Sequence, residues 1–286
     1  MSESPDPSNN NVWLASYPKS GNTWMRIALI TLRGGGKEID LSNLRNNIGI
    51  FLAMRHRLDM ALDIDSSDLS PEEAWLLRPK IYGLIDTQGR DKTIWKIHDC
   101  WERTVDGEAL FPAEATAAPI YLVRDPRDVA ASFAHHFDVD IDKAIALMAD
   151  RDYSVAAKIA SSHVHLPQHY SSWSGHVTSW LDQSGLNPLL IRYEDMIADF
   201  AAVLRLVSAA LGWNSSEAAI QATIAATRFD RLRQQEKAGN FSESLQDGRL
   251  FFRRGIAGGW RDTLSPAQAA RIERDHGEVM HRLGYL

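Results

Sequence analysis

Cysteine is nearly absent from this sequence: the 286 residues include a single one, Cys100. One cysteine cannot form a disulfide within the chain, which excludes the disulfide-rich secreted class and is typical of a reducing compartment. Long apolar runs are also lacking, since none approaches the ~20 residues of a membrane-spanning helix. Residues 1–11 are polar and acidic with no apolar centre, so they do not resemble a signal peptide. We therefore expect a cytoplasmic protein with no membrane span.

An excess of positive charge is lacking too. The 37 acidic residues outnumber the 31 lysines and arginines, which gives a formal net charge of −6. A general nucleic-acid binder carries a basic surface, so we expect no nucleic-acid partner. A zinc-binding pattern is also missing, because five histidines in the middle of the chain match no standard spacing and have no cysteine partners: His135, His136, His163, His165 and His169. We therefore predict no metal site.

The pattern of apolar segments predicts an α/β fold. Short apolar runs have the length and composition of strands, and helical segments separate them. These runs cover residues 12–16, 92–98, 119–123 and 189–193. Strands that alternate with helices form a mainly parallel sheet flanked by helices, with ligands at the carboxyl ends of the strands. We predict a single domain over residues 12–286, preceded by a disordered tail over residues 1–11.

The first of these runs leads into a turn with the features of an anion site. Pro18 and Gly21 break the regular structure, and the apolar stretch that follows predicts a buried helix. In a strand–turn–helix unit, free backbone N–H groups and the positive end of the helix face whatever lies in the turn. Lys19 adds a full positive charge, while Ser20 and Thr23 add hydroxyl donors. By itself the turn is equally compatible with an ordinary Pro/Gly turn that carries an exposed lysine.

Polar side chains also follow the next two strands. Period-two alternation places Lys96 and His98 side by side on one face of their strand. Arg124 directly follows residues 119–123, and Ser132 lies further along the helix that begins there. A lone histidine at a strand end is more often structural than catalytic, so these residues alone leave the role of His98 open.

The turn resembles a motif of one enzyme family. The stretch Tyr-Pro-Lys-Ser-Gly-Asn-Thr-Trp at residues 17–24 is similar to the 5′-phosphosulfate loop of the sulfotransferases that use 3′-phosphoadenosine 5′-phosphosulfate (PAPS). Asn22 stands where the family usually has threonine. The stretch does not match Walker A, because its lysine precedes the glycine. The resemblance implies a P-loop-nucleotide-kinase-like fold and assigns PAPS contacts to Lys19, Ser20, Gly21, Asn22, Thr23 and Trp24.

Further motifs extend the resemblance over residues 12–261. Lys96-Ile97-His98 is similar to the family's Lys-Thr-His, in which the histidine is the catalytic base. The stretch from Arg124 to Ser132 is similar to the 3′-phosphate site. Residues 251–261 are similar to the third family signature, with Gly259 where aspartate is usual. The additional cofactor contacts implied by the resemblance, of which the segment at 227–229 is the weakest match, are Arg124, Ser132, Tyr193, Thr227, Phe229, Arg253, Arg254 and Gly255.

The resemblance implies sulfuryl transfer from PAPS, without a metal, to a hydroxyl or less readily an amine of a small-molecule acceptor. In this interpretation Lys19 stabilises the leaving phosphate, Lys96 lies near the transferring sulfonate, and His98 takes the acceptor's proton. Residues 235–249 are polar with two glycines and predict a lid. Two alternatives stay open: a kinase-like phosphoryl-transfer enzyme that needs magnesium and ATP, and a nucleotide-binding module without catalysis. The sequence identifies neither the acceptor nor the oligomeric state.

Overall fold

The computed structural model describes residues 10–44, 50–51, 54–82, 92–155, 165–245 and 248–286. Residues 1–9 of the expected tail and His163 lie outside them. Asn11, the last residue of the expected tail, belongs to the first strand. Its side-chain amide donates to the carbonyl oxygen of Ala115 (2.8 Å) and accepts a hydrogen bond from Trp95 Nε1 (2.7 Å). A buried amide with such partners is part of the folded domain.

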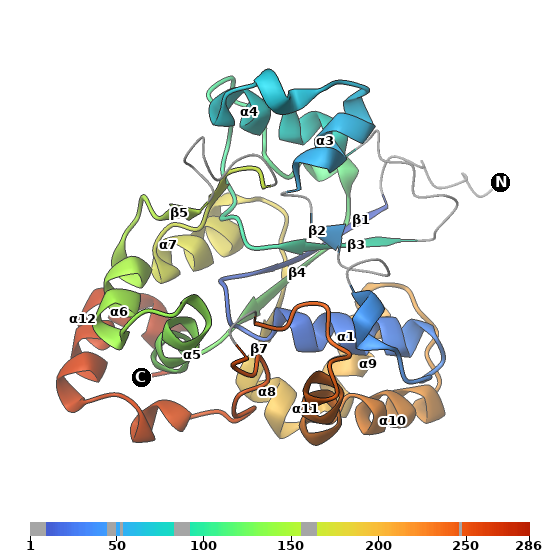
Figure 1. Ribbon diagram of the computed structural model, residues 1–286, viewed down its shortest axis with the longest axis vertical. Helices are drawn as coiled ribbons and strands as arrows, with labels where there is room; N and C mark the ends of the chain where they lie inside the picture. Colours follow the sequence, from blue (N-terminus) through green and yellow to red (C-terminus); the bar gives the residue numbers. More distant parts are fainter. Residues whose placement is uncertain (1–9, 45–49, 52–53, 83–91, 156–164, 246–247) are drawn as a thin grey trace.

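A five-stranded parallel sheet forms the centre of the protein (Figure 1). Its strands, in the order β2-β3-β1-β4-β7, are β1 (Asn11–Ser16), β2 (Ile50–Phe51), β3 (Thr93–Ile97), β4 (Thr116–Val123) and β7 (Leu189–Arg192). Every neighbouring pair in this sheet is parallel. A separate antiparallel pair is formed by β5 (Ser154–Val155) and β6 (Gln168–His169). The predicted α/β fold with a mainly parallel sheet is therefore confirmed.

Period-two alternation sends the side chains of β1 into two cores, one on each face of the sheet. Val12 and Leu14 pack into one core, and Trp13 and Ala15 pack into the other. The helices of the first core are α1 (Asn22–Arg33), α8 (Tyr193–Ala198), α9 (Phe200–Ala210) and α10 (Glu217–Ala226). The helices of the second core are α3 (Arg55–Leu62), α4 (Pro71–Ile81), α5 (Pro126–Phe137), α6 (Ile141–Ala149), α7 (Trp173–Thr178) and α12 (Pro266–Arg282). Strands with both faces covered are expected to be apolar, as residues 12–15 of β1 are.

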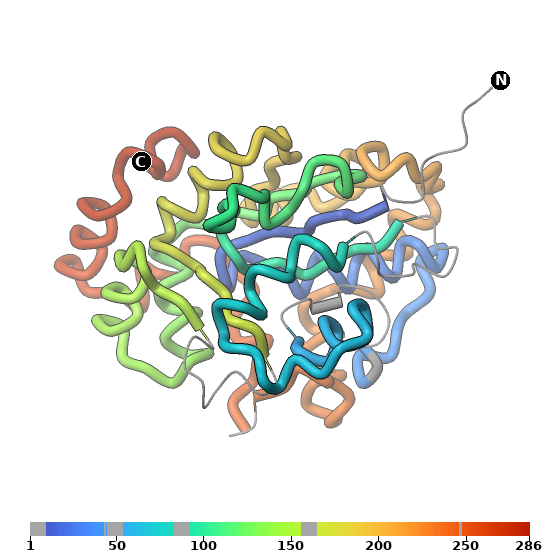
Figure 2. Tube along the Cα trace, turned by 90° about the horizontal axis from the view of Figure 1, so that it is seen from above, coloured from blue at the N-terminus to red at the C-terminus, as the bar shows by residue number. Residues whose placement is uncertain are grey.

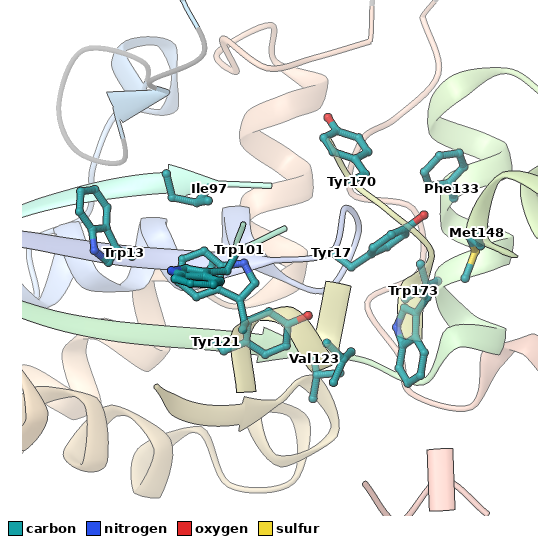
Figure 3. Packing of buried hydrophobic residues seen from close by; sticks show 14 of the residues in the cluster. Trp13, Tyr17, Ile97, Trp101, Tyr121, Val123, Phe133, Met148, Tyr170 and Trp173 are labelled. Carbon is teal, nitrogen blue, oxygen red and sulfur yellow. The ribbon is translucent and has the colours of Figure 1, made fainter. Parts of the chain in front are cut away.

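The second core is rich in aromatic side chains (Figure 3). Figure 2 gives the view from above, with α12 in red at one end of the protein. A third, smaller cluster joins α1 to α11 (Phe229–Lys237) and to the two aromatic residues Phe241 and Phe252. The remaining helical elements are short: η1 (Leu41–Asn43), η2 (Ser66–Asp68), η3 (Ala113–Ala115), the π-helix η5 (Ser179–Gln183) and η6 (Gly259–Asp262).

The strand register brings the carboxyl ends of four strands to one edge of the sheet. The pairs at this edge are Ala15 with Ile97, Ser16 with Leu122, and Val123 with Arg192. The residues that come next in the chain are Tyr17, His98, Arg124 and Tyr193. Four segments far apart in the sequence therefore meet where ligands bind in folds of this kind.

A buried ion pair holds the chain directly after β3. The Arg78 guanidinium donates to both carboxylate oxygens of Asp99, at 2.7 and 3.1 Å, and the two side chains are 0% and 2% exposed. Trp180 Nε1 also donates to the backbone carbonyl of Asp99 (2.9 Å). Because Asp99 follows His98, these contacts of α4 and η5 also position the histidine.

Candidate active site

The turn between β1 and α1 has a backbone that exposes N–H groups. Lys19 has a φ of 72° and Gly21 a φ of 101°, both in the left-handed region, and alternation of left- and right-handed residues makes an anion-binding concavity. A Cβ on Gly21 would lie 2.7 Å from Cδ2 of Tyr193, so only glycine fits there. Gly21 begins α1 with no side-chain cap. The positive end of α1 therefore keeps its N–H groups for a ligand.

One cavity of about 550 Å³ opens beside this turn. Fourteen of the predicted site residues line it: Lys19, Gly21, Asn22, Thr23, Trp24, Lys96, His98, Arg124, Ser132, Tyr193, Phe229, Arg253, Arg254 and Gly255. Two predicted contacts do not line it. Ser20 is fully buried within the turn, and the buried hydroxyl of Thr227 donates to the carbonyl of Thr223 (2.8 Å). The backbone carbonyl of Thr227 accepts from Trp24 Nε1 (3.1 Å), so Thr227 supports the wall through Trp24.

His98 is held in a single tautomer suited to a base. Its Nδ1 lies 2.8 Å from the carbonyl oxygen of Ser16 and therefore carries the proton, which leaves Nε2 with the free lone pair. Burial, then the charge of Lys96, holds the pKa of His98 well below its usual value. The imidazole is consequently neutral at pH 7. His176 Nε2 donates to the backbone carbonyl of His98 (3.1 Å) and accepts at Nδ1 from the Tyr121 hydroxyl (2.7 Å).

Burial and neighbouring positive charges disfavour the charged form of Lys19. Burial, followed by the nearby charges of Lys96 and Arg124, lowers its pKa to about 7. Its Nζ lies 4.0 Å from the ring centre of Phe251, which offers a weak cation–π contact. An anion placed beside Lys19 would replace the missing solvation of the ammonium group.

A second cationic group lies at the end of β4. The Arg124 guanidinium stacks over the Tyr193 ring at 4.1 Å and donates to the carbonyl of Ile256 (2.8 Å). Burial, then Arg254 and Arg124, lowers the pKa of Arg253, as expected where like charges gather. Asp128 on α5 accepts from the backbone N–H groups of Gly258 (2.7 Å) and Trp260 (2.8 Å). This carboxylate ties the C-terminal loop to the end of β4, so Arg253 comes beside Arg124.

The remaining predicted residues form an aromatic wall. Trp24 packs edge-on against Tyr193, with ring centres 5.9 Å apart. Gly255, at a φ of 62°, lies so close to Phe229 that a Cβ there would be 2.2 Å from the ring. Flat rings of this kind suit a nucleobase.

The departures from the family pattern have local explanations. Both N–H groups of the Asn22 amide are used within the protein, on the carbonyl of Leu14 (2.9 Å) and the hydroxyl of Ser16 (3.2 Å). In this structure the side-chain amide of Asn22 therefore ties α1 to β1. Ile97 is buried in the second core, away from Lys96 and His98, as its place in the strand predicts. Gly259 begins η6, and a Cβ there would lie 3.1 Å from Ile256.

Sequence reasoning missed several residues of the cavity. The clearest are Arg26 and Glu243, whose charged groups meet at 2.7 Å. An arginine inside an otherwise apolar helical stretch was the available signal for Arg26. Glu243 could not be singled out as a cavity residue from the sequence, because glutamates are common in polar segments. Apolar wall residues were missed as well, among them Met54, Phe137, Tyr170 and Phe251.

The fold also brings Cys100 next to a histidine and a carboxylate. The Sγ of Cys100 lies 3.3 Å, and a Glu102 carboxylate oxygen 2.9 Å, from His169 Nδ1. These hydrogen bonds, that of Cys100 first, raise the pKa of His169 to about 11. Hydrogen bonds among the three side chains therefore account for the cluster.

A family model described as "Sulfotransferase domain" matches residues 112–284. The fold and the site are those of a nucleotide-dependent transferase. The match to the family model identifies this transferase as a sulfotransferase. The chain belongs to the sulfotransferase family and is a PAPS-dependent sulfotransferase.

Relatives agree with this assignment. Rat sulfotransferase 2B1 is 24% identical over 285 residues, 96% of this chain and 72% of the relative. Among solved structures, mouse sulfotransferase SULT7A1 complexed with PAP has a TM-score of 0.58 at 20% identity, covering 95% of this chain and 84% of that one. Retinol dehydratase in complex with retinol and PAP has a TM-score of 0.60 at 20% identity, covering 97% and 82%. The two structures share the fold. Across the described part of this chain, no helix is long and apolar enough to cross a membrane.

Proposed function

We propose that this enzyme moves the sulfuryl group of PAPS to the hydroxyl of a small, largely apolar acceptor, with His98 as the general base. One observation carries the proposal: a single cavity joins the Lys19 turn to the Arg124 and Arg253 group, and His98 lines the same cavity. Two separate cationic groups suit a nucleotide that carries phosphate at two positions. A neutral histidine in the same cavity suits proton removal.

In the proposed arrangement, the 5′-phosphosulfate lies in the turn and the 3′-phosphate lies with the arginines. The backbone N–H groups of the turn bind the 5′-phosphosulfate together with Lys19 and Thr23. The 3′-phosphate binds to Arg124, Ser132 and Arg253, because a planar guanidinium can hold a phosphate with two hydrogen bonds. Arg254 contributes at the rim, since it is exposed and paired with Asp262 at 2.8 Å.

The residues of the turn and of β3 share the chemical work. Nε2 of His98 accepts the acceptor's proton as the new S–O bond forms. The bond between sulfur and the 5′-phosphate oxygen breaks, and Lys19 stabilises the negative charge that develops on that phosphate. Lys96 balances the charge of the transferring sulfonate. Most of the acceleration then comes from positioning and fixed charge.

The described wall near His98 supports an apolar alcohol as the acceptor. The Tyr170 ring centre lies 6.3 Å from that of His98, and Met54 and Phe137 also line the cavity. The retinol dehydratase structures contain retinol or androsterone, both of which fit this description. Another relative is a rabbit amine sulfotransferase. We favour a hydroxyl, because an alkylammonium would meet the charges of Lys96 and Lys19.

We also propose that residues 12–286 act as one sulfotransferase domain. The family model matches only from residue 112, yet the turn at Lys19 lines the same cavity as Arg253. The N-terminal third is needed to complete the site.

The test of the proposed function compares PAP and PAPS with Mg-ATP. We expect PAP to raise the unfolding free energy by about 2.7 kcal/mol at a hundredfold excess over its dissociation constant. Mg-ATP should have a smaller effect, since it has no 3′-phosphate for Arg124 and Arg253. Incubation of PAPS with a panel of apolar alcohols, phenols and amines in EDTA should give a product heavier by one sulfonate. An equal or larger effect of Mg-ATP would favour a kinase, and PAP binding without any transfer would favour a binding module.

The lowered pKa of Lys19 makes PAP binding depend on protons. At pH 8, above the pKa of about 7 in the free enzyme, most Lys19 is neutral. A bound phosphate favours the ammonium form and raises that pKa, so binding at pH 8 should take up about one proton. Titration calorimetry in buffers of different ionisation enthalpy measures this number. Lys19→Arg should remove the uptake, because a guanidinium stays charged. Proton-independent binding by the wild type would contradict the assignment.

A further inference from the structure

An ionised carboxylate lies inside the anion site itself. The two carboxylate oxygens of Glu243 each lie 2.7 Å from Arg26 Nη2, and one also lies 3.3 Å from Thr23 Oγ1 and 3.8 Å from Lys96 Nζ. Its side chain is 14% exposed, and it lines the cavity with Lys19 and His98. Two of its partners, Thr23 and Lys96, are the groups assigned above to the phosphosulfate.

The cationic neighbours keep this carboxylate charged. Although burial opposes ionisation, Lys96 and Arg26 together lower the pKa of Glu243 to about 2. At neutral pH the site therefore holds a negative charge of its own. A carboxylate and a sulfonate oxygen seek the same donors, so both cannot be satisfied by Thr23 and Lys96 at once.

We propose that Glu243 is a further residue of the donor site: an internal anion that binds Thr23, Arg26 and Lys96 until the phosphosulfate of PAPS takes its place. The inference rests on the proposed function, because it uses the placement of the phosphosulfate in the Lys19 turn. Glu243 thus lowers the affinity for PAPS. It also favours loss of PAP, because it regains its partners when the nucleotide leaves.

The segment around Glu243 can let its side chain move while the backbone stays anchored. Phe241 is 5% exposed and packs on Phe251 and Phe252, with ring centres 5.3 and 5.1 Å apart. The backbone N–H of Ser242 donates to the carbonyl of Leu41 (3.2 Å). In the proposed exchange, the carboxylate withdraws by a rotamer change while these anchors stay in place. The lid over residues 235–249 stays a prediction, and residues 246–247 lie outside the described residues.

The experiment measures PAP and PAPS affinity, without acceptor, for the wild type and Glu243→Gln. Removing a negative charge a few ångströms from the phosphosulfate should tighten PAPS binding about tenfold or more. The gain should be smaller for PAP, which places no sulfonate beside Lys96. Glu38→Gln is the matched control: Glu38 is exposed, pairs with Arg231 and contacts Gln235 on α11, and does not line the cavity. It should bind both nucleotides as the wild type does.

Melting temperatures separate exchange from a structural role. If the phosphosulfate replaces the Glu243 carboxylate, Glu243→Gln should melt lower than the wild type without a ligand. Saturating PAPS should then raise the melting temperature of the variant by more than that of the wild type. A purely structural ion pair with Arg26 predicts equal losses with and without PAPS, and that result would overturn the proposal. So would unchanged or weaker PAPS binding.

Glu243→Asp provides a variant that keeps a charge for Arg26, and it should tighten binding in the same direction but by less. Failure of the wild type itself to bind PAP would instead refute the proposed function.

Discussion

His98→Ala should lower the rate of sulfuryl transfer by about 10²–10⁴-fold while leaving PAP affinity close to that of the wild type. Nε2 of His98 has the free lone pair, because Nδ1 donates to the Ser16 carbonyl. The hydrogen bonds of His98 go to Ser16 and His176, and not to the arginines of the proposed 3′-phosphate site. The loss should therefore fall on transfer and not on nucleotide binding. Mass spectrometry of the sulfonated product and calorimetry with PAP measure the two quantities separately.

Two observations would contradict this assignment. Wild-type rates in His98→Ala would remove the base from the mechanism, and a collapse of PAP binding would give His98 a structural role. His281→Ala is a suitable control, because His281 is exposed on α12 and does not line the cavity. Burial and Lys96 lower the pKa of His98. The fall in rate at low pH that is caused by protonation of His98 should therefore occur well below pH 6.5.

Asp99→Ala should destabilise the protein by about 3–5 kcal/mol, because it leaves the guanidinium of Arg78 buried without its partner. Arg78 is 0% exposed, and it also donates to the carbonyl of Pro167 (3.2 Å). Urea unfolding measures the loss. Asp182→Ala is the matched control, since Asp182 forms a similar pair with Arg282 at the surface. The side chain of Asp182 is 41% exposed and that of Arg282 is 48% exposed. Such a surface pair contributes roughly 0–1 kcal/mol.

A second variant separates the buried charge from the local packing. Arg78→Met combined with Asp99→Ala removes both charges and should recover most of the stability. A single variant as stable as the wild type would mean that water reaches Arg78. The consequence for function is direct: Asp99 follows His98, so loosening this pair should also reduce the rate.

The residues of the proposed phosphosulfate turn are contiguous, so the shape of the turn could be predicted. Their backbone geometry depends on a few φ angles at Lys19 and Gly21, and the sequence shows a glycine where the left-handed conformation is needed. The alternation of Lys96 and His98 was equally readable, since the period of a strand is two. The helix start at Asp125 and Pro126 is local too, and the Asp125 carboxylate does cap α5 through the N–H of Arg127 (2.9 Å).

Contacts between distant residues could not be predicted in this way. Arg26 and Glu243 are 217 positions apart, and neither residue type at its position predicts the other. The same holds for Cys100 and His169, which histidine spacing alone did not connect. Thr227 was predicted from a weak match, and the structure turns its hydroxyl onto its own helix. The bonds of the Asn22 amide to two acceptors on β1 could not be predicted from the motif either.

The sequence by itself determined the fold class, the family, the phosphate turn and the order of charged residues after the strands. Each of these follows from short-range periodicity or from a contiguous motif. Only the tertiary structure decided which nitrogen of His98 is basic, how far the charge of Lys19 is disfavoured, and that Glu243 lies among the anion-binding groups. Those properties depend on burial and on partners from other parts of the chain, and neither exists until the sheet has brought its strand ends together.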